Sequence, residues 1–167
     1  MAASAVIKHF TDGTITLKDG TGTPVSLVVP FSVGDLSISG METDTLGRTV
    51  NAYETRGVLH SLRRGARVYP TVSFSAQLTD VTDATDKTLL DMILKRNSYS
   101  ANVSTTAATG DVYTLDVVFT VEGTDLGDSA DHVITLEDVH FTADVAEGEP
   151  NTISLSGTIY GTVTLTT

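Results

Sequence analysis

The sequence predicts an all-β fold: a β-sandwich of two packed sheets, partly barrel-like, with one flanking α-helix and a long irregular loop. The main observation is a period of two in hydrophobicity that recurs along the chain and is typical of half-buried strands. The composition agrees, with 14 glycines, few aromatic residues and no tryptophan. A length of 167 residues suits a single domain covering residues 1–167, large enough to bury a core.

Strand-like segments separated by turn signals fill the first half of the chain. Residues 5–10 and 14–18 flank Asp12 and Gly13, a dipeptide favoured in β-hairpin turns. Alternating apolar residues predict three further strands, at 25–33, 35–39 and 66–78.

An irregular segment interrupts these strands at residues 40–51, GMETDTLGRTVN. It contains two glycines and shows no clear hydrophobic period, in contrast to the regular alternation that begins at residue 66. We therefore expect a long loop between the strand at 35–39 and the strand at 66–78.

One segment has helical rather than strand-like spacing. Residues 82–97 begin with Thr and Asp residues suited to an N-cap and end with Lys, Arg and Asn, which complement a helix C-terminus. The pattern predicts one helix of about three turns, packed on a sheet through an apolar stripe. The stripe consists of Leu89, Leu90, Ile93 and Leu94.

The last third of the chain again predicts strands. Apolar residues alternate from Tyr113 to Val121, and again from Ile134 to Val145. In the second stretch the phase changes by one residue at Glu137-Asp138, which is the effect of a β-bulge. A final strand is expected from residue 153 onward, so the total is eight to ten strands.

The final predicted strand has an unusual polar face that carries hydroxyl groups and no charge, and the polar face of the strand at 66–78 is nearly all neutral as well, apart from Arg67. Exposed or edge strands usually carry Lys or Glu on that face, which keeps them soluble and blocks edge-to-edge pairing. An uncharged face is unexpected in a chain of net charge -11. The residues that form these faces are Thr71, Ser73 and Ser75 in one strand and Ser154, Thr158 and Thr162 in the other.

The charge and the cysteine content limit the classes of function. With 21 acidic and 10 basic residues, the chain is poorly suited to tight binding of a phosphate backbone. It has no cysteine for disulfides or a Cys-based metal site. The N-terminal residues do not resemble a signal peptide, and no stretch is apolar enough for a membrane span. We expect synthesis in a reducing cytoplasm and no membrane partner.

No motif indicates catalysis. The four histidines are far apart, and neither a nucleophile motif nor a phosphate-binding loop is present, so we expect no enzyme activity, no catalytic residues, no metal and no cofactor. His140, near Asp138 and Asp144, is interpreted as a solvated residue. The carboxylates of Asp125, Asp128 and Asp131 could bind Ca²⁺, but a turn rich in Asp is the favoured interpretation.

Four of the ten basic residues lie within twelve positions, at Arg56, Arg63, Arg64 and Arg67. A nucleic-acid patch would need stacking aromatics and a less acidic surrounding chain. A solvated face is a second interpretation. We favour pairing with carboxylates of another copy of the chain, since Arg forms bidentate ion pairs at interfaces.

The order of these features resembles the tail tube (major tail) proteins of long-tailed bacteriophages. The similarity covers nearly the whole chain: the N-terminal hairpin, the excursion GMETDTLGRTVNAYETRG, the helix TDKTLLDMILKR after VYPTVSFSAQLTD, and the closing strands through TISLSGTIYGTVTLT. The resemblance implies a virion protein that forms hexameric rings, stacked into a tube through which DNA passes without specific binding. Other tail proteins would bind the tube ends.

The resemblance also implies roles for particular residues. The excursion at about 40–57 would be the loop that stacks ring on ring, and one or the other of the two hydroxyl faces described above would line the lumen. The stacking loop would include Met41, Glu42, Thr43, Asp44, Leu46, Arg48 and Val50.

Two other classes of function compete with this interpretation. Another virion module, such as a capsid decoration or tail-completion protein, would share the composition and the tendency to assemble. A monomeric carbohydrate-binding β-sandwich is disfavoured, because sugar platforms generally need aromatic faces and the chain has no Trp.

Overall fold

The computed structural model describes residues 7, 12–41, 47–79, 88–105, 112–124 and 127–167. The predicted strand at 5–10 therefore lies almost entirely outside the described residues. In these residues, no helix has the length and apolar character needed to span a membrane. The elements in chain order are β1 (Thr14–Lys18), β2 (Ser26–Val28), β3 (Ser37–Ser39), β4 (Arg48–Thr55), β5 (Val58–Arg67), β6 (Thr71–Gln77), α1 (Leu89–Leu94), η2 (Asn97–Tyr99), β7 (Leu115–Val121), β8 (His132–Ala146), β9 (Thr152–Ile159) and β10 (Val163–Thr166).

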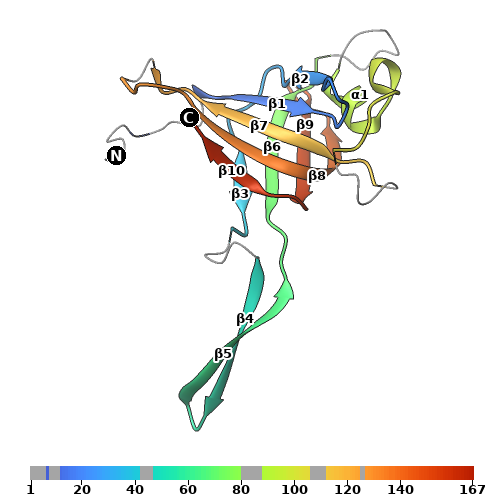
Figure 1. Ribbon diagram of the computed structural model, residues 1–167. Helices are drawn as coiled ribbons and strands as arrows, with labels where there is room; N and C mark the ends of the chain where they lie inside the picture. The colour runs from blue at the N-terminus through green and yellow to red at the C-terminus, as the bar shows by residue number, and fades with distance from the viewer. Residues whose placement is uncertain (1–6, 8–11, 42–46, 80–87, 106–111, 125–126) are drawn as a thin grey trace.

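Eight strands form one antiparallel sheet in the order β2-β1-β7-β8-β9-β6-β3, with β10 also paired to β8. The strands β1, β7 and the first part of β8 lie in front of β6 and β9 and cross them (Figure 1). The predicted all-β fold is confirmed. Its two layers are the two halves of this one bent sheet, in keeping with the partly barrel-like form that the sequence suggested.

The core lies between the two layers and follows the predicted alternation. In β6 the buried residues Val72, Phe74 and Ala76 alternate with Thr and Ser, and β9 repeats the pattern. Gly157 sits in this buried row of β9. A Cβ atom there would lie 2.8 Å from the ring of Phe141, so glycine leaves the space in which that ring packs edge-on against Phe74.

The predicted β-bulge is present in β8. Leu115 of β7 pairs with Val139 and Val117 pairs with Leu136, so two residues of β8 lie opposite Asp116 alone. Asp138 has a left-handed backbone (φ 56°), and its N–H donates to the Asp116 carboxylate at 3.0 Å. The bulge divides β8 into a part that pairs with β7 and β10 and a part that pairs with β9.

The alternation predicted one continuous final strand, but the strand is interrupted at residues 160–162. The N–H groups of Tyr160 and Gly161 bond to the carbonyls of Asp138 and Glu137 at the bulge. Thr162 Oγ1 donates to the Glu137 carboxylate. The chain must follow the bend of its neighbour β8 at this point, so the segment divides into β9 and β10.

The helix is shorter than predicted, and its buried face differs. Residues 80–87 lie outside the described part, and α1 begins at the N-cap Thr88, whose hydroxyl accepts the N–H of Asp91 at 3.1 Å. Met92 is fully buried, whereas Leu94, which the predicted stripe included, is 49% exposed. Leu90 and Ile93 are partly buried against the core.

This packing gives a matched pair of substitutions on one helix. Met92→Ala is expected to lower the free energy of unfolding by about 2–5 kcal/mol, because it leaves a cavity in the core. Leu94→Ala should cost about 1 kcal/mol or less, since half of that side chain is already in water. Chemical denaturation of both variants would test the packing, and equal losses would contradict it.

The expected irregular loop is the largest correction to the sequence-based fold. Its second part is the strand β4, which pairs with β5 as a separate two-stranded antiparallel sheet. Met41 and Gly47 flank residues 42–46, which lie outside the described part. The β4–β5 hairpin projects away from the eight-stranded sheet (Figure 1).

Candidate assembly surfaces

The hydroxyl face predicted from two strands extends over four neighbouring ones. Strand pairing places Ser37 of β3, Ser73 of β6, Ser156 of β9 and Thr142 of β8 in one row across the sheet. We call the outward side of β3, β6, β9 and the second part of β8 the hydroxyl face. Its hydroxyl residues are Ser37, Ser39, Thr71, Ser73, Ser75, Thr142, Thr152, Ser154, Ser156 and Thr158.

Two further rows contain hydroxyl groups of neighbouring strands, and Thr152 lies in a last row with Gln77 and Ala146. Ser39, Thr71, Thr158 and His140 form the first. In the second, the hydroxyls of Ser75 and Ser154 lie 3.1 Å apart, with Asp144 next in register. The strands that form this face contain neither Lys nor Arg.

Five of the six predicted lumen residues are brought together on the hydroxyl face. The exception is Thr162, which lies in the interruption after β9 and bonds to Glu137. Sequence reasoning missed Thr152 and Ser156 of β9 and, on the other strands, Ser37, Ser39 and Thr142. Each of these residues alternates with apolar neighbours in its own strand, but only the strand order shows that they continue the same surface.

The β4–β5 hairpin is closed by a tight turn at Arg56-Gly57. Thr55 pairs with Val58, and both turn residues have positive φ (51° and 77°), the geometry of a two-residue type I′ turn. Glycine meets the requirement at the second position without strain.

The residues of the hairpin strands are almost all exposed, the exceptions being the half-buried Ser61 and Gly65. Exposed apolar residues lie among exposed arginines; the large ones are Val50, Tyr53, Val58, Leu59 and Leu62. A two-stranded hairpin is marginal in water unless another surface covers it.

The base of the hairpin is anchored to the body of the same chain. The Arg67 guanidinium lies 4.7 Å from the ring centroid of Tyr69, whose ring lies 4.8 Å from that of Tyr160. The Val68 N–H donates to the Gly47 carbonyl at 2.6 Å. Arg67, predicted to pair between subunits, is thus engaged within its own chain. Arg56 is in the turn, and Arg63 and Arg64 are exposed residues of β5.

Charge is divided unequally between the hairpin and the rest of the chain. Residues 48–67 contain five of the ten basic residues and one of the 21 acidic residues, Glu54, a net charge of +4. The remaining residues therefore carry a net charge of -15. The hairpin is the strongly basic part of an acidic protein.

An acidic surface lies at the turn between β8 and β9. The exposed carboxylates of Glu147 and Glu149 line a hollow of about 520 Å³ together with Leu78 and Val145, and the exposed Asp144 precedes them at the end of β8. We call these three carboxylates and the hollow the acidic turn.

The histidine and aspartate candidates have structural partners. The Asp131 carboxylate accepts the N–H groups of Gly123 and Thr124 at 3.0 and 3.1 Å, and these bonds hold its pKa below the usual value. Asp125 lies outside the described residues. His140 Nδ1 is 3.1 Å from the Tyr113 carbonyl oxygen. In the described part of the chain, no three His, Asp or Glu side chains gather as metal ligands would.

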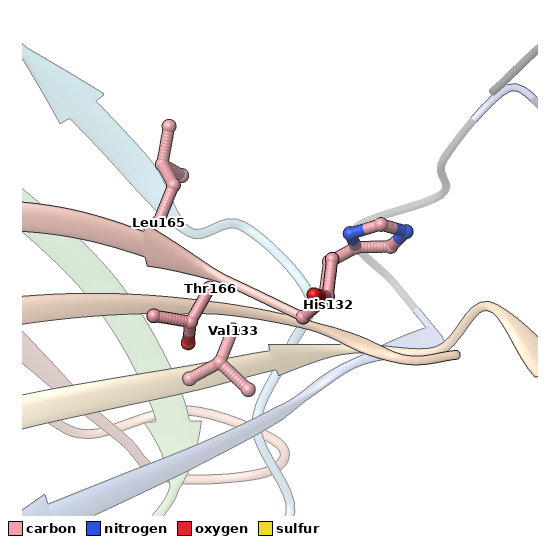
Figure 2. Close-up of a pocket in the computed structure, with 5 residues that line it drawn as sticks. His132, Val133, Leu165 and Thr166 are labelled. Carbon is pink, nitrogen blue, oxygen red and sulfur yellow. The ribbon is translucent and has the colours of Figure 1, made fainter. Parts of the chain in front are cut away.

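An open hollow lies where β8 and β10 run side by side, lined by His132, Val133, Leu165, Thr166 and Thr167. The His132 ring points away from Leu165 (Figure 2) and bonds to the Asp128 carboxylate at 3.0 Å. No nucleophile of this hollow is hydrogen-bonded to His132 in the described contacts, so the arrangement does not indicate catalysis.

The sequence matches no known protein family and no curated protein. Solved structures do resemble the fold. The sheath/tube terminator of an extracellular contractile injection system, PVC, in the extended state has a TM-score of 0.58 at 11% identity, covering 99% of this chain and 100% of that chain. The tube-terminating cap of the anti-feeding prophage AFP has a TM-score of 0.54 at 13% identity, over 100% of this chain and 95% of that one.

A chain of the PVC sheath–tube complex in the extended state also matches, with a TM-score of 0.53 at 10% identity. The match covers 93% of this chain and 88% of that chain. The chain shares the fold of these injection-system proteins. Because the sequence identity is this low, the similarity concerns the fold alone, over nearly the whole length of the chain.

Proposed function

We propose that this protein is a structural subunit of the tube of a phage-like tail: it polymerises as stacked rings, hexameric in the family it resembles, and DNA leaves the virion through the lumen. The observation that carries the proposal is the hydroxyl face, which continues over four strands without a Lys or Arg. The similarity of the fold to tail-like injection systems supports it.

A face of this extent without Lys or Arg suits the lining of a channel for DNA. Positive side chains would bind phosphates and release counterions at every contact, so they would retain the DNA. Hydroxyl groups stay hydrated and give phosphates no fixed charge to bind. In a closed ring the sheet edges are also paired between subunits, which removes the aggregation hazard of unguarded edges.

The hairpin is proposed to make the contacts between rings that the resemblance assigned to the excursion at 40–57. The predicted stacking residues Met41, Arg48 and Val50 are exposed, and residues 42–46 lie outside the described part. Arg56, Arg63 and Arg64 would pair with carboxylates of another copy, while other tail proteins would bind the tube ends.

A second candidate is a protein that ends the tube instead of forming its length. Two of the similar structures are a tube terminator and a tube-terminating cap, and each is covered almost completely. A terminator would form one ring and then stop, whereas a tube subunit would continue to add rings.

Negative-stain electron microscopy of the concentrated protein, with light scattering for mass, separates these functions. We expect tubes of uniform width that lengthen with protein concentration. Single rings that do not stack would support the terminator. A stable monomer at high concentration would contradict both functions.

A further inference from the structure

The body of this protein offers a surface that matches its own hairpin. We propose that the β4–β5 hairpin of one copy docks on the acidic turn between β8 and β9 of a second copy. This inference rests on the proposed function and goes further, because it names the surface that receives the hairpin.

The two surfaces lie at opposite ends of the same strands. The hairpin joins the sheet just before Thr71, which pairs with Thr158 of β9. The acidic turn joins it at the other end, where Gln77 pairs with Thr152 and Thr152 pairs with Ala146 of β8. The hairpin extends the direction of β6 away from the sheet (Figure 1).

This placement favours a head-to-tail contact between copies. Each copy offers a hairpin at one end and an acidic turn at the other. When the hairpin of one copy binds the acidic turn of a second copy, the first copy keeps a free acidic turn and the second keeps a free hairpin. Such heterologous contacts generate open arrays, as growth of a tube requires. The ten residues of β5 extend about 30 Å, enough to reach beyond the body of their own copy.

The two surfaces are complementary in charge. The hairpin carries a net charge of +4, and the acidic turn carries three exposed carboxylates in its short segment of chain, Asp144 to Asn151, which contains no Lys or Arg. Opposite charges steer the encounter and fix the register of an interface.

Both surfaces also contain exposed apolar groups. Val145 at the acidic turn is 54% exposed. Phe31 is 65% exposed and lies at the same end of the sheet, because its carbonyl accepts the N–H of Gln77 at 3.1 Å. The apolar residues of the hairpin, Leu59 and Leu62 among them, would be removed from water against these groups.

Cysteine cross-linking tests the contact directly, since the native chain has no cysteine. Val58 at the tip of the hairpin and Ala146 beside the acidic turn are both exposed. Oxidation of assembled Val58→Cys/Ala146→Cys protein should give a ladder of covalent multimers on a non-reducing gel. Each single variant should give dimers at most.

Charge reversal tests the energetics. Glu147→Lys/Glu149→Lys is expected to reduce the fraction of protein in sedimentable tubes at least tenfold at low salt, because attraction becomes repulsion. Adding Arg56→Glu/Arg63→Glu to the same chain should restore much of the lost tube assembly, because the two surfaces then again carry opposite charges. Asp12→Lys, an exposed change of charge before β1, should leave assembly within about twofold.

The outcomes separate this inference from the proposed function. If the unmodified protein forms no tubes, the proposed function is wrong. If it forms tubes, and the paired cysteines give no ladder or the Glu147/Glu149 reversal assembles normally, the hairpin docks elsewhere and this inference is overturned. Circular dichroism of each variant must match the native spectrum, so that loss of assembly is not loss of folding.

Discussion

Replacement of residues 48–67 by a short Gly-Ser linker is expected to give a folded monomer that no longer forms tubes. None of the core residues lies in this segment. The ends of the deletion are already adjacent, since the Val68 N–H bonds to the Gly47 carbonyl at 2.6 Å. The body should therefore close without strain, and its free energy of unfolding should change by about 1 kcal/mol or less.

Sedimentation and electron microscopy measure the loss of tubes, and urea denaturation measures the stability of the body. A control that keeps the hairpin but replaces Gly57, whose φ is +77°, with Asn should still assemble, because Asn tolerates this backbone conformation. Tubes that grow from the deleted protein would refute the stacking role. Unfolding of the deleted protein would show that the hairpin belongs to the folded body.

Thr158→Lys is expected to give soluble protein and normal tubes, but particles that deliver DNA poorly. Thr158 is central on the hydroxyl face, with Thr71 on one side and His140 on the other. In a ring, each subunit would add one cation to the same level of the channel, and every stacked ring would repeat it. Each phosphate contact adds to the salt-dependent binding free energy, so the DNA would be retained.

The measurement is the rate of DNA ejection from particles assembled with the variant, at low and high salt. Thr158→Ser, which keeps the hydroxyl, should eject at the normal rate. The stability of the monomer should change by about 0.5 kcal/mol or less, because the position faces away from the core. Normal ejection by the Lys particles at low salt would contradict the lumen role of this face.

Strands were predicted well from the sequence where one of their faces is buried. In β6 and β9 every second residue is buried in the core, so apolar residues recur at every second position of the sequence. The bulge in β8 was predictable for the same reason: an inserted residue shifts the buried face, and the apolar positions shift with it at Glu137-Asp138.

The hairpin was missed because neither of its faces is buried in the subunit. Without a buried face, nothing requires alternation in TVNAYET, and the segment therefore resembles a loop. The remaining signal was the dipeptide Arg56-Gly57, which is a weaker hairpin turn signal than Asn-Gly or Asp-Gly. The helix was predicted in the correct place, but helical spacing did not reveal that Met92 would replace Leu94 in the core.

The candidate surfaces needed the strand order as well as the sequence. Alternation predicted the uncharged faces of β6 and β9 separately, and the structure shows that they are adjacent and extended by β3 and β8. The acidic turn had no signal of its own in an acidic chain. The acidic turn is a candidate docking surface because it lies at the end of the sheet opposite to the hairpin.

The pairing of β1 with β7 and of β6 with β9 has a consequence for how the subunit folds. The sheet closes only when Thr14 meets Thr120 and Thr71 meets Thr158, so these two ladders join residues far apart in sequence. Folds dominated by such nonlocal pairings form slowly, because the entropy of loop closure is lost before the contacts are gained. The β4–β5 hairpin, in contrast, joins neighbouring residues through a two-residue turn. During synthesis, the hairpin that we propose contacts other copies can thus begin to pair before the body that carries it has closed.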